Sequence, residues 1–106
     1  MITYSRIDRK DLGELKIAIR WENERKIYVS MIDLIYMTMI SEEDFLNECR
    51  SQIILPNIDE VYLDINEVIE SLKRRNTLKD QRIIDWIEND IIPSVKVMPE
   101  GTPLKL

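Results

Sequence analysis

The spacing of apolar residues in this chain changes at Ser30 from a period of two to a helical period. Residues 15–21 alternate apolar with other side chains, which is typical of a strand with one buried face. A polar turn follows, and residues 26–29 are apolar enough to return beside that strand, so the two segments predict a hairpin. Residues 31–40 predict a helix, because Ser30 followed by Asp33 is the order of a helix-capping sequence.

The predicted helix over residues 31–40 is apolar on almost every side. Such a helix is normally buried in a core or lies in an interface. We expect Met31, Tyr36, Met37 and Met39 in the core, and the alternative is that they are buried against a second copy in a homodimer. Because isoleucine, tyrosine and threonine also favour strands, a strand is the alternative secondary structure here.

Three further capping sequences divide the second half of the chain. Ser41 precedes a short helix, Asp64 precedes a longer one, and Thr77 precedes the last. The longer helix has an inward stripe of four apolar residues, Ile65, Val68, Ile69 and Leu72. Between the capped helices we expect residues 51–57 to be irregular and residues 60–63 to form a short strand.

The last helix carries a broad apolar face and a tryptophan. Its apolar face consists of Ile83, Ile84, Ile87 and Ile91. Trp86 lies at the edge of that face and is expected to anchor the core rather than to stack on a nucleic-acid base. For Trp21, on the predicted hairpin, both a core position and an exposed contact stay open. Pro93 lacks an amide hydrogen and disfavours helical geometry in the residue before it, so the helix is predicted to end there.

The chain is long enough for one domain with a real core, since 44% of its 106 residues are apolar. We predict a single α+β domain over residues 1–97, in which a small β-hairpin sheet packs against three to four helices, and a flexible tail over residues 98–106. The lone Cys49 cannot form an internal disulfide, which favours a reducing, cytoplasmic location. The most apolar run, residues 27–40, is too short for a bilayer and contains Asp33, so no membrane span is expected.

The chain contains no histidine, which narrows its chemistry. Ser–His and Cys–His nucleophile pairs are impossible, and one cysteine cannot make a zinc site. Gly13 and Gly101 stand alone, so no glycine-rich phosphate-binding loop exists. The densest acidic cluster, Glu42, Glu43 and Asp44, is expected to complement a helix dipole rather than to act as acid and base. We therefore expect a non-enzyme with no catalytic residue, cofactor or metal.

Three segments carry a family resemblance. Tyr28-Val-Ser-Met-Ile-Asp-Leu-Ile35 is a strand, a turn and a helix opened by an aspartate, and Val61-Tyr-Leu-Asp-Ile-Asn-Glu-Val-Ile69 is an apolar strand, an Asn–Glu pair and a helix. Asp85-Trp86 is followed by Ile91-Ile-Pro-Ser-Val-Lys96. In this order they resemble the BRO N-terminal domain of phage antirepressors and viral BRO proteins, which closes with a Trp and a Leu-Pro-Ser-Ile-Arg-like ending. The resemblance spans about residues 17–97.

Members of that family are generally taken to bind DNA, so the resemblance implies a small α+β DNA-binding or regulatory module. The overall charge of −5 opposes this, but the window between Ser71 and Arg82 carries +4 and the remainder −9. The candidate nucleic-acid-binding residues are Lys73, Arg74, Arg75, Lys79 and Arg82. Five cations neutralise at most about five phosphates, which gives a salt slope no steeper than roughly −4 to −5. The alternative is a solvated helix end, where such cations complement the helix dipole.

Two functions therefore stay open. In the first, the chain is a phage or prophage regulator of the BRO antirepressor type that binds DNA through the basic window. In the second, it is an acidic protein that binds and inhibits a host nucleic-acid enzyme or a defence system. The first 70 residues contain 15 acids against eight bases, and such a surface would meet a basic partner.

Overall fold

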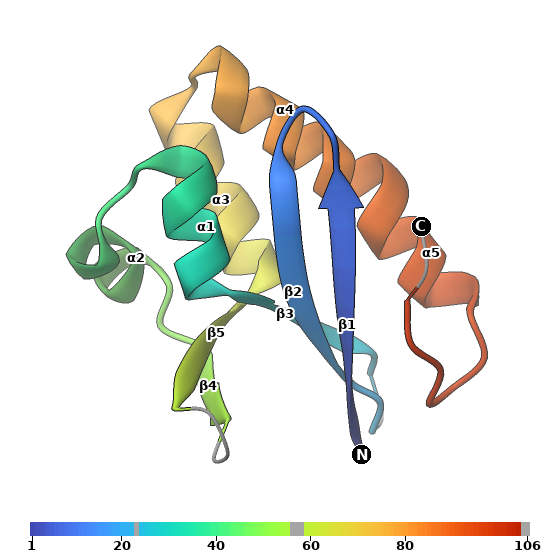
Figure 1. Cartoon of the computed structure of the whole chain (residues 1–106). Coiled ribbons are helices and arrows are strands. Elements are labelled where there is room, and N and C mark those ends of the chain that lie inside the picture. The colour runs from blue at the N-terminus through green and yellow to red at the C-terminus, as the bar shows by residue number, and fades with distance from the viewer. Residues whose placement is uncertain (23, 56–58, 105–106) are drawn as a thin grey trace.

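The computed structural model describes residues 1–22, 24–55 and 59–104, which form a five-stranded sheet and its helices (Figure 1). The strands are β1 (Ile2–Arg9), β2 (Gly13–Arg20), β3 (Lys26–Ser30), β4 (Gln52–Leu55) and β5 (Glu60–Asp64). The helices are α1 (Met31–Thr38), α2 (Glu42–Glu48), α3 (Ile65–Arg75), α4 (Leu78–Trp86) and α5 (Ile92–Val97), with the π-helical turn η1 (Ile87–Ile91) before α5. The predicted α+β class is confirmed. None of these described helices has the length and apolar character to cross a membrane.

The strands lie in the order β1-β2-β3-β5-β4, and every neighbouring pair is antiparallel. The predicted hairpin is confirmed in β2 and β3, and the strand predicted over residues 60–63 is confirmed in β5. Sequence reasoning missed β1. Residues 51–57 were predicted to be irregular, and this is wrong for Gln52–Leu55, which form β4 and pair with β5. Four residues are too few to show an alternating pattern. Residues 56 and 57 lie outside the described residues.

Each predicted helix start is confirmed by a side chain that caps it. The caps are Ser30, Ser41, Asp64 and Thr77, which each accept a backbone amide of the first helical turn. The strand alternative for residues 31–40 is therefore wrong, since α1 occupies Met31–Thr38. In a capping box the acidic side chain in the first turn also bonds back to the amide of the cap residue. Here two of these acids bond to distant residues instead: Asp33 accepts from Lys16, and Glu67 accepts from the amide of Ser51 at 2.7 Å.

The last helix does not end at Pro93, so that prediction is wrong. The helical path continues from α4 through η1 into α5, which holds Pro93 in its first turn. At the end of η1 the amide of Ile92 donates to the carbonyl of Ile87, five residues earlier. In a regular helix the proline ring clashes with the carbonyl four residues before it, and the wider π-helical turn relieves this clash.

The core lies on one face of the sheet, where α4 passes behind β2 and β1 and the chain continues to α5 on the right of β1 (Figure 1). The predicted stripes of α3 and of the last helix are buried. Trp86 is 3% exposed, which confirms it as a core anchor, and Trp21 is also buried, with its Nε1 donating to Thr3 Oγ1 at 2.9 Å. The opposite face carries a smaller cluster of Ala18, Tyr28 and Tyr62.

Of the four residues in segment 31–40 that were expected in the core, the structure buries two. Met31 and Met37 are buried, whereas Tyr36 is 79% exposed and Met39 is 83% exposed. The core expectation is thus wrong for Tyr36 and Met39. A single helix at the side of a sheet buries one stripe, here Met31, Leu34 and Met37, and leaves its other side to solvent.

The chain turns back toward β1 after α5. The guanidinium of Arg25 donates to the carbonyl oxygens of Val95 and Met98, at 2.8 and 2.5 Å. Leu104 is buried, and its amide donates to the hydroxyl of Ser5 at 2.7 Å. That residues 98–106 are flexible stays a prediction, although Leu104 within that segment is held by its burial and by this hydrogen bond. Residues 105 and 106 lie outside the described residues.

Candidate functional site

The basic window lies at the junction of α3 and α4. Asn76 ends α3 in the left-handed conformation, with φ of 52°, and Thr77 caps the start of α4. The five candidate residues occupy the last turn of α3 and the first two turns of α4: Lys73, Arg74, Arg75, Lys79 and Arg82. The fold therefore places all five at one corner of the molecule, although their surroundings differ.

Arg74 and Arg75 are paired with carboxylates of α2. Arg75 Nη2 lies 2.5 Å from Glu48 Oε2 and 3.8 Å from Asp44 Oδ2, and Arg74 Nη2 lies 3.3 Å from Glu48 Oε1. Burial on its own would raise the pKa of Glu48, but the charge and hydrogen bond of Arg75, with help from Arg74, hold that pKa below its ordinary value. These two arginines hold α2 against α3, which is a structural use of their charge.

Lys73 is paired more loosely. Its Nζ lies 3.6 Å from Glu88 Oε1 in η1, and both side chains are about half exposed. Surface ion pairs of this kind contribute about 0–1 kcal/mol, because water screens them and both side chains lose freedom. A phosphate could therefore displace Glu88 from Lys73 more easily than it could displace Glu48 from the two arginines.

Lys79 and Arg82 are exposed and take part in none of the ion pairs found among the described residues. Lys79 lies in the first turn of α4, where the helix dipole disfavours a cation. Its position is thus not explained by stabilisation of its own helix. Of the five candidates, these two are the ones with free charge.

A second polar cluster joins α1 to the sheet. Asp33 accepts the backbone amide of Lys16 at 2.7 Å and its ammonium at 3.0 Å, and Lys16 Nζ lies 3.4 Å from Glu60. Ser30, fully buried, donates its hydroxyl to Glu60 at 2.8 Å. Burial on its own would lower the pKa of Lys16, but the hydrogen bond and charge of Asp33, together with Glu60, raise it. Sequence reasoning missed this cluster, because Lys16 and Glu60 lie far from Asp33 along the chain and carry no local signal.

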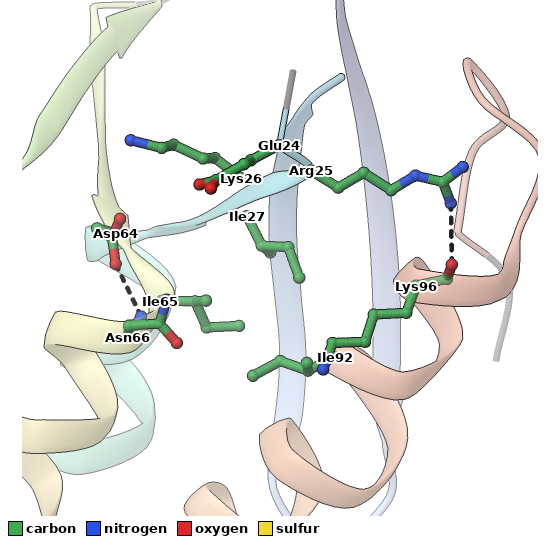
Figure 2. Close-up of a pocket in the computed structure, with 9 residues that line it drawn as sticks. All are labelled: Glu24, Arg25, Lys26, Ile27, Asp64, Ile65, Asn66, Ile92 and Lys96. Atoms are coloured by element: carbon green, nitrogen blue, oxygen red, sulfur yellow. Dashed lines mark hydrogen bonds between the residues drawn. The ribbon is translucent and has the colours of Figure 1, made fainter. Parts of the chain in front are cut away.

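A surface pocket of about 470 Å³ lies where β3 starts, between the first turn of α3 and α5 (Figure 2). Asp64 already caps α3 by accepting the amide of Asn66 at 2.8 Å, and Arg25 points away from the pocket toward a backbone carbonyl of α5. The ammonium of Lys96 lies beside Ile92 within it. Besides Lys96, the pocket is lined by Lys26 and by the carboxylates of Glu24 and Asp64, so it carries charges of both signs.

Two further observations concern metal binding and the single thiol. Within the part of the chain that the structure describes, no group of three His, Cys, Asp or Glu side chains could hold a metal ion. Cys49 is fully buried, and burial, with the charges of Glu67 and Glu48, raises the pKa of its thiol to about 11. At neutral pH the thiol is therefore protonated and a poor nucleophile.

Comparison with known proteins gave no match to a family model, to a curated protein or to a solved structure. The resemblance to the BRO N-terminal domain therefore stays a prediction. Its three segments occupy β3 with α1, β5 with α3, and α4 through α5. Asn66 of the second segment and Lys96 of the third line the same pocket.

Proposed function

We propose that this chain is a non-catalytic regulatory module that binds a partner protein, in the manner of a phage-borne inhibitor of a nucleic-acid enzyme or a defence system. The observation that supports it is the pairing of Arg74 and Arg75 with Glu48. This pairing neutralises two of the five cations that a chain of net charge −5 would offer to a polyanion. We also propose that the protein acts inside a cell, where the single Cys49 stays reduced.

The acidic start of α2 is the surface we assign to the basic partner. Glu42 and Glu43 are exposed and take part in none of the ion pairs among the described residues. Complementary charges of this kind accelerate association and select partners more than they add affinity. An enzyme that binds nucleic acid has the opposite charge on its own surface, so it is the partner class that fits.

Affinity capture from the cell that expresses the chain tests this proposal. The double variant Glu42→Lys/Glu43→Lys is compared with Asp90→Lys/Glu100→Lys, which makes the same change in net charge at other exposed positions. We expect the wild type and the control to retain a basic protein that the first variant loses, and retention should fall as salt is raised. Equal retention by all three chains would reject the proposal.

DNA binding is the second candidate function, and the free charges of Lys79 and Arg82 favour it. Two phosphate contacts predict a salt slope of roughly −2, whereas opening of the pairs around Lys73, Arg74 and Arg75 would bring the slope to roughly −4 to −5. A salt titration with generic duplex DNA, with Lys79→Glu/Arg82→Glu as the variant, measures this slope. Absence of binding even at low salt would exclude DNA as the ligand.

A further inference from the structure

Three apolar side chains are exposed to solvent on α1 and directly after its last turn. Ile32, Tyr36 and Met39 are 46%, 79% and 83% exposed. Ile32 and Tyr36 are four residues apart and lie on the same face of α1, and Met39 follows directly after the last turn of that helix, so the three form a short apolar row that ends beyond the helix. Single exposed apolar residues are common on protein surfaces, but a row at this spacing has the form of a helix that inserts into a groove on another protein.

The backbone of Met39 strengthens this observation. Met39 follows the last turn of α1 in the left-handed conformation, with φ of 63°, and its amide donates to the carbonyl of Ile35 at 2.8 Å. Glycine is the usual residue at this position of a helix end, because a side chain there costs free energy. The side chain of Met39 is almost fully exposed, so burial does not offset that cost. A costly and exposed methionine suggests a function outside the fold itself.

The acids that follow this row in the chain indicate which partner it fits. Glu42 and Glu43 begin α2 three residues after Met39, and both are exposed. We infer that the row Ile32, Tyr36 and Met39 docks into an apolar groove of a partner protein whose rim carries lysines or arginines. Tyr36, in the middle of the row, supplies the aromatic anchor that such interfaces favour. This inference rests on the proposed function and assigns the surface that carries it.

A second copy of the chain fits this row less well. A two-fold interface brings the same patch of both copies together, so the acids of two α2 helices would approach each other in a chain of net charge −5. A partner whose groove has a basic rim meets these acids with the opposite charge.

The closing experiment compares four chains: wild type, Tyr36→Ala, Met39→Gly and Leu78→Ala. Leu78 is the matched control, because it is an apolar residue of α4 that is also 83% exposed. Proteins captured from the expressing cell are identified, and the captured protein is then titrated against each purified chain at low and high salt. We expect at least tenfold weaker binding for Tyr36→Ala and Met39→Gly, less than a twofold change for Leu78→Ala, and weaker binding at high salt.

Melting temperatures and sedimentation complete the test. Met39→Gly should melt no lower than the wild type, because glycine removes the strain at this position, and weaker binding then cannot be assigned to unfolding. A partner that tolerates both α1 variants but is lost on Glu42→Lys/Glu43→Lys would overturn this inference and leave the proposed function standing. A dimer of the wild type that Tyr36→Ala dissociates would identify a second copy as the occupant and also overturn it.

Discussion

Replacing Asp33 with alanine is expected to destabilise the fold, because its carboxylate binds both the backbone amide and the ammonium of Lys16. The pairing of β2 with β3 stops at Ile17 and Val29, so the next amide of β2, that of Lys16, has no partner on β3. The carboxylate of Asp33 accepts that amide at 2.7 Å and the ammonium of the same residue at 3.0 Å. Truncation removes both bonds and leaves the part-buried amide unpaired.

The magnitude follows from these two bonds. A hydrogen bond to a charged group contributes about 1.5–3 kcal/mol, and a part-buried ion pair adds up to about 1 kcal/mol. Glu60, 3.4 Å from the ammonium of Lys16, compensates only part of the lost charge. Asp33→Ala should therefore lower the free energy of unfolding by about 1.5–4 kcal/mol. For a domain near this size, that corresponds to a fall in Tm of roughly 6–30 °C.

Urea unfolding followed by circular dichroism measures this loss, provided that the transition stays two-state. Asp33→Asn keeps one acceptor oxygen without the charge, so it should lose about half as much. Asp90→Ala is the control, because Asp90 is exposed in η1 and takes part in no ion pair among the described residues, and it should change stability by less than about 0.5 kcal/mol. A loss below about 1 kcal/mol for Asp33→Ala would refute this account of how α1 is held to β2.

Three further predictions concern single residues. The pKa of Glu48 lies below its ordinary value of 4.5. Its ion pair therefore stabilises the fold fully above pH 4.5, and this stabilisation is lost as the pH falls through the lowered pKa. Glu48→Gln should flatten the acid limb of a stability–pH profile. Cys49, with a pKa of about 11, should react with thiol reagents at pH 8 only as fast as the protein unfolds, and a rapid reaction in native buffer would contradict its burial. Gly13 has φ of +114°, so Gly13→Ala should cost about 1–3 kcal/mol in urea unfolding, although no atom lies near the added carbon.

The elements that sequence patterns predict here are those specified within a few residues. Each helix start depends on one side chain and an amide two or three positions later, so Ser41 and Thr77 could be assigned without knowledge of the fold. The π-helical turn before Pro93 depends on packing along the whole last helix, and the proline rule alone therefore gave the wrong end.

The first strand escaped sequence analysis for a different reason. Thr3 and Ser5 share the core face of β1 with Ile7, so the face lacks the apolar alternation that identifies a strand. Their hydroxyls bond to Trp21 and to the amide of Leu104, which lie at distant positions in the sequence. Polar residues are compatible with a core only when they have hydrogen-bond partners. The pattern of one segment does not show which distant residues supply those partners.

Contacts from distant residues also decide which variants can test the basic window. Its charge is visible in the sequence, but the carboxylate of Glu48, which neutralises Arg74 and Arg75, comes from another helix. A charge reversal at Arg74 would therefore repel Glu48 and loosen α2, so lost binding after that change would not distinguish a ligand contact from a damaged fold. Reversal of Lys79 and Arg82 breaks no ion pair among the described residues and also removes the unfavourable charge from the start of α4. A loss of DNA binding in a variant at least as stable as the wild type can be assigned to the contact alone.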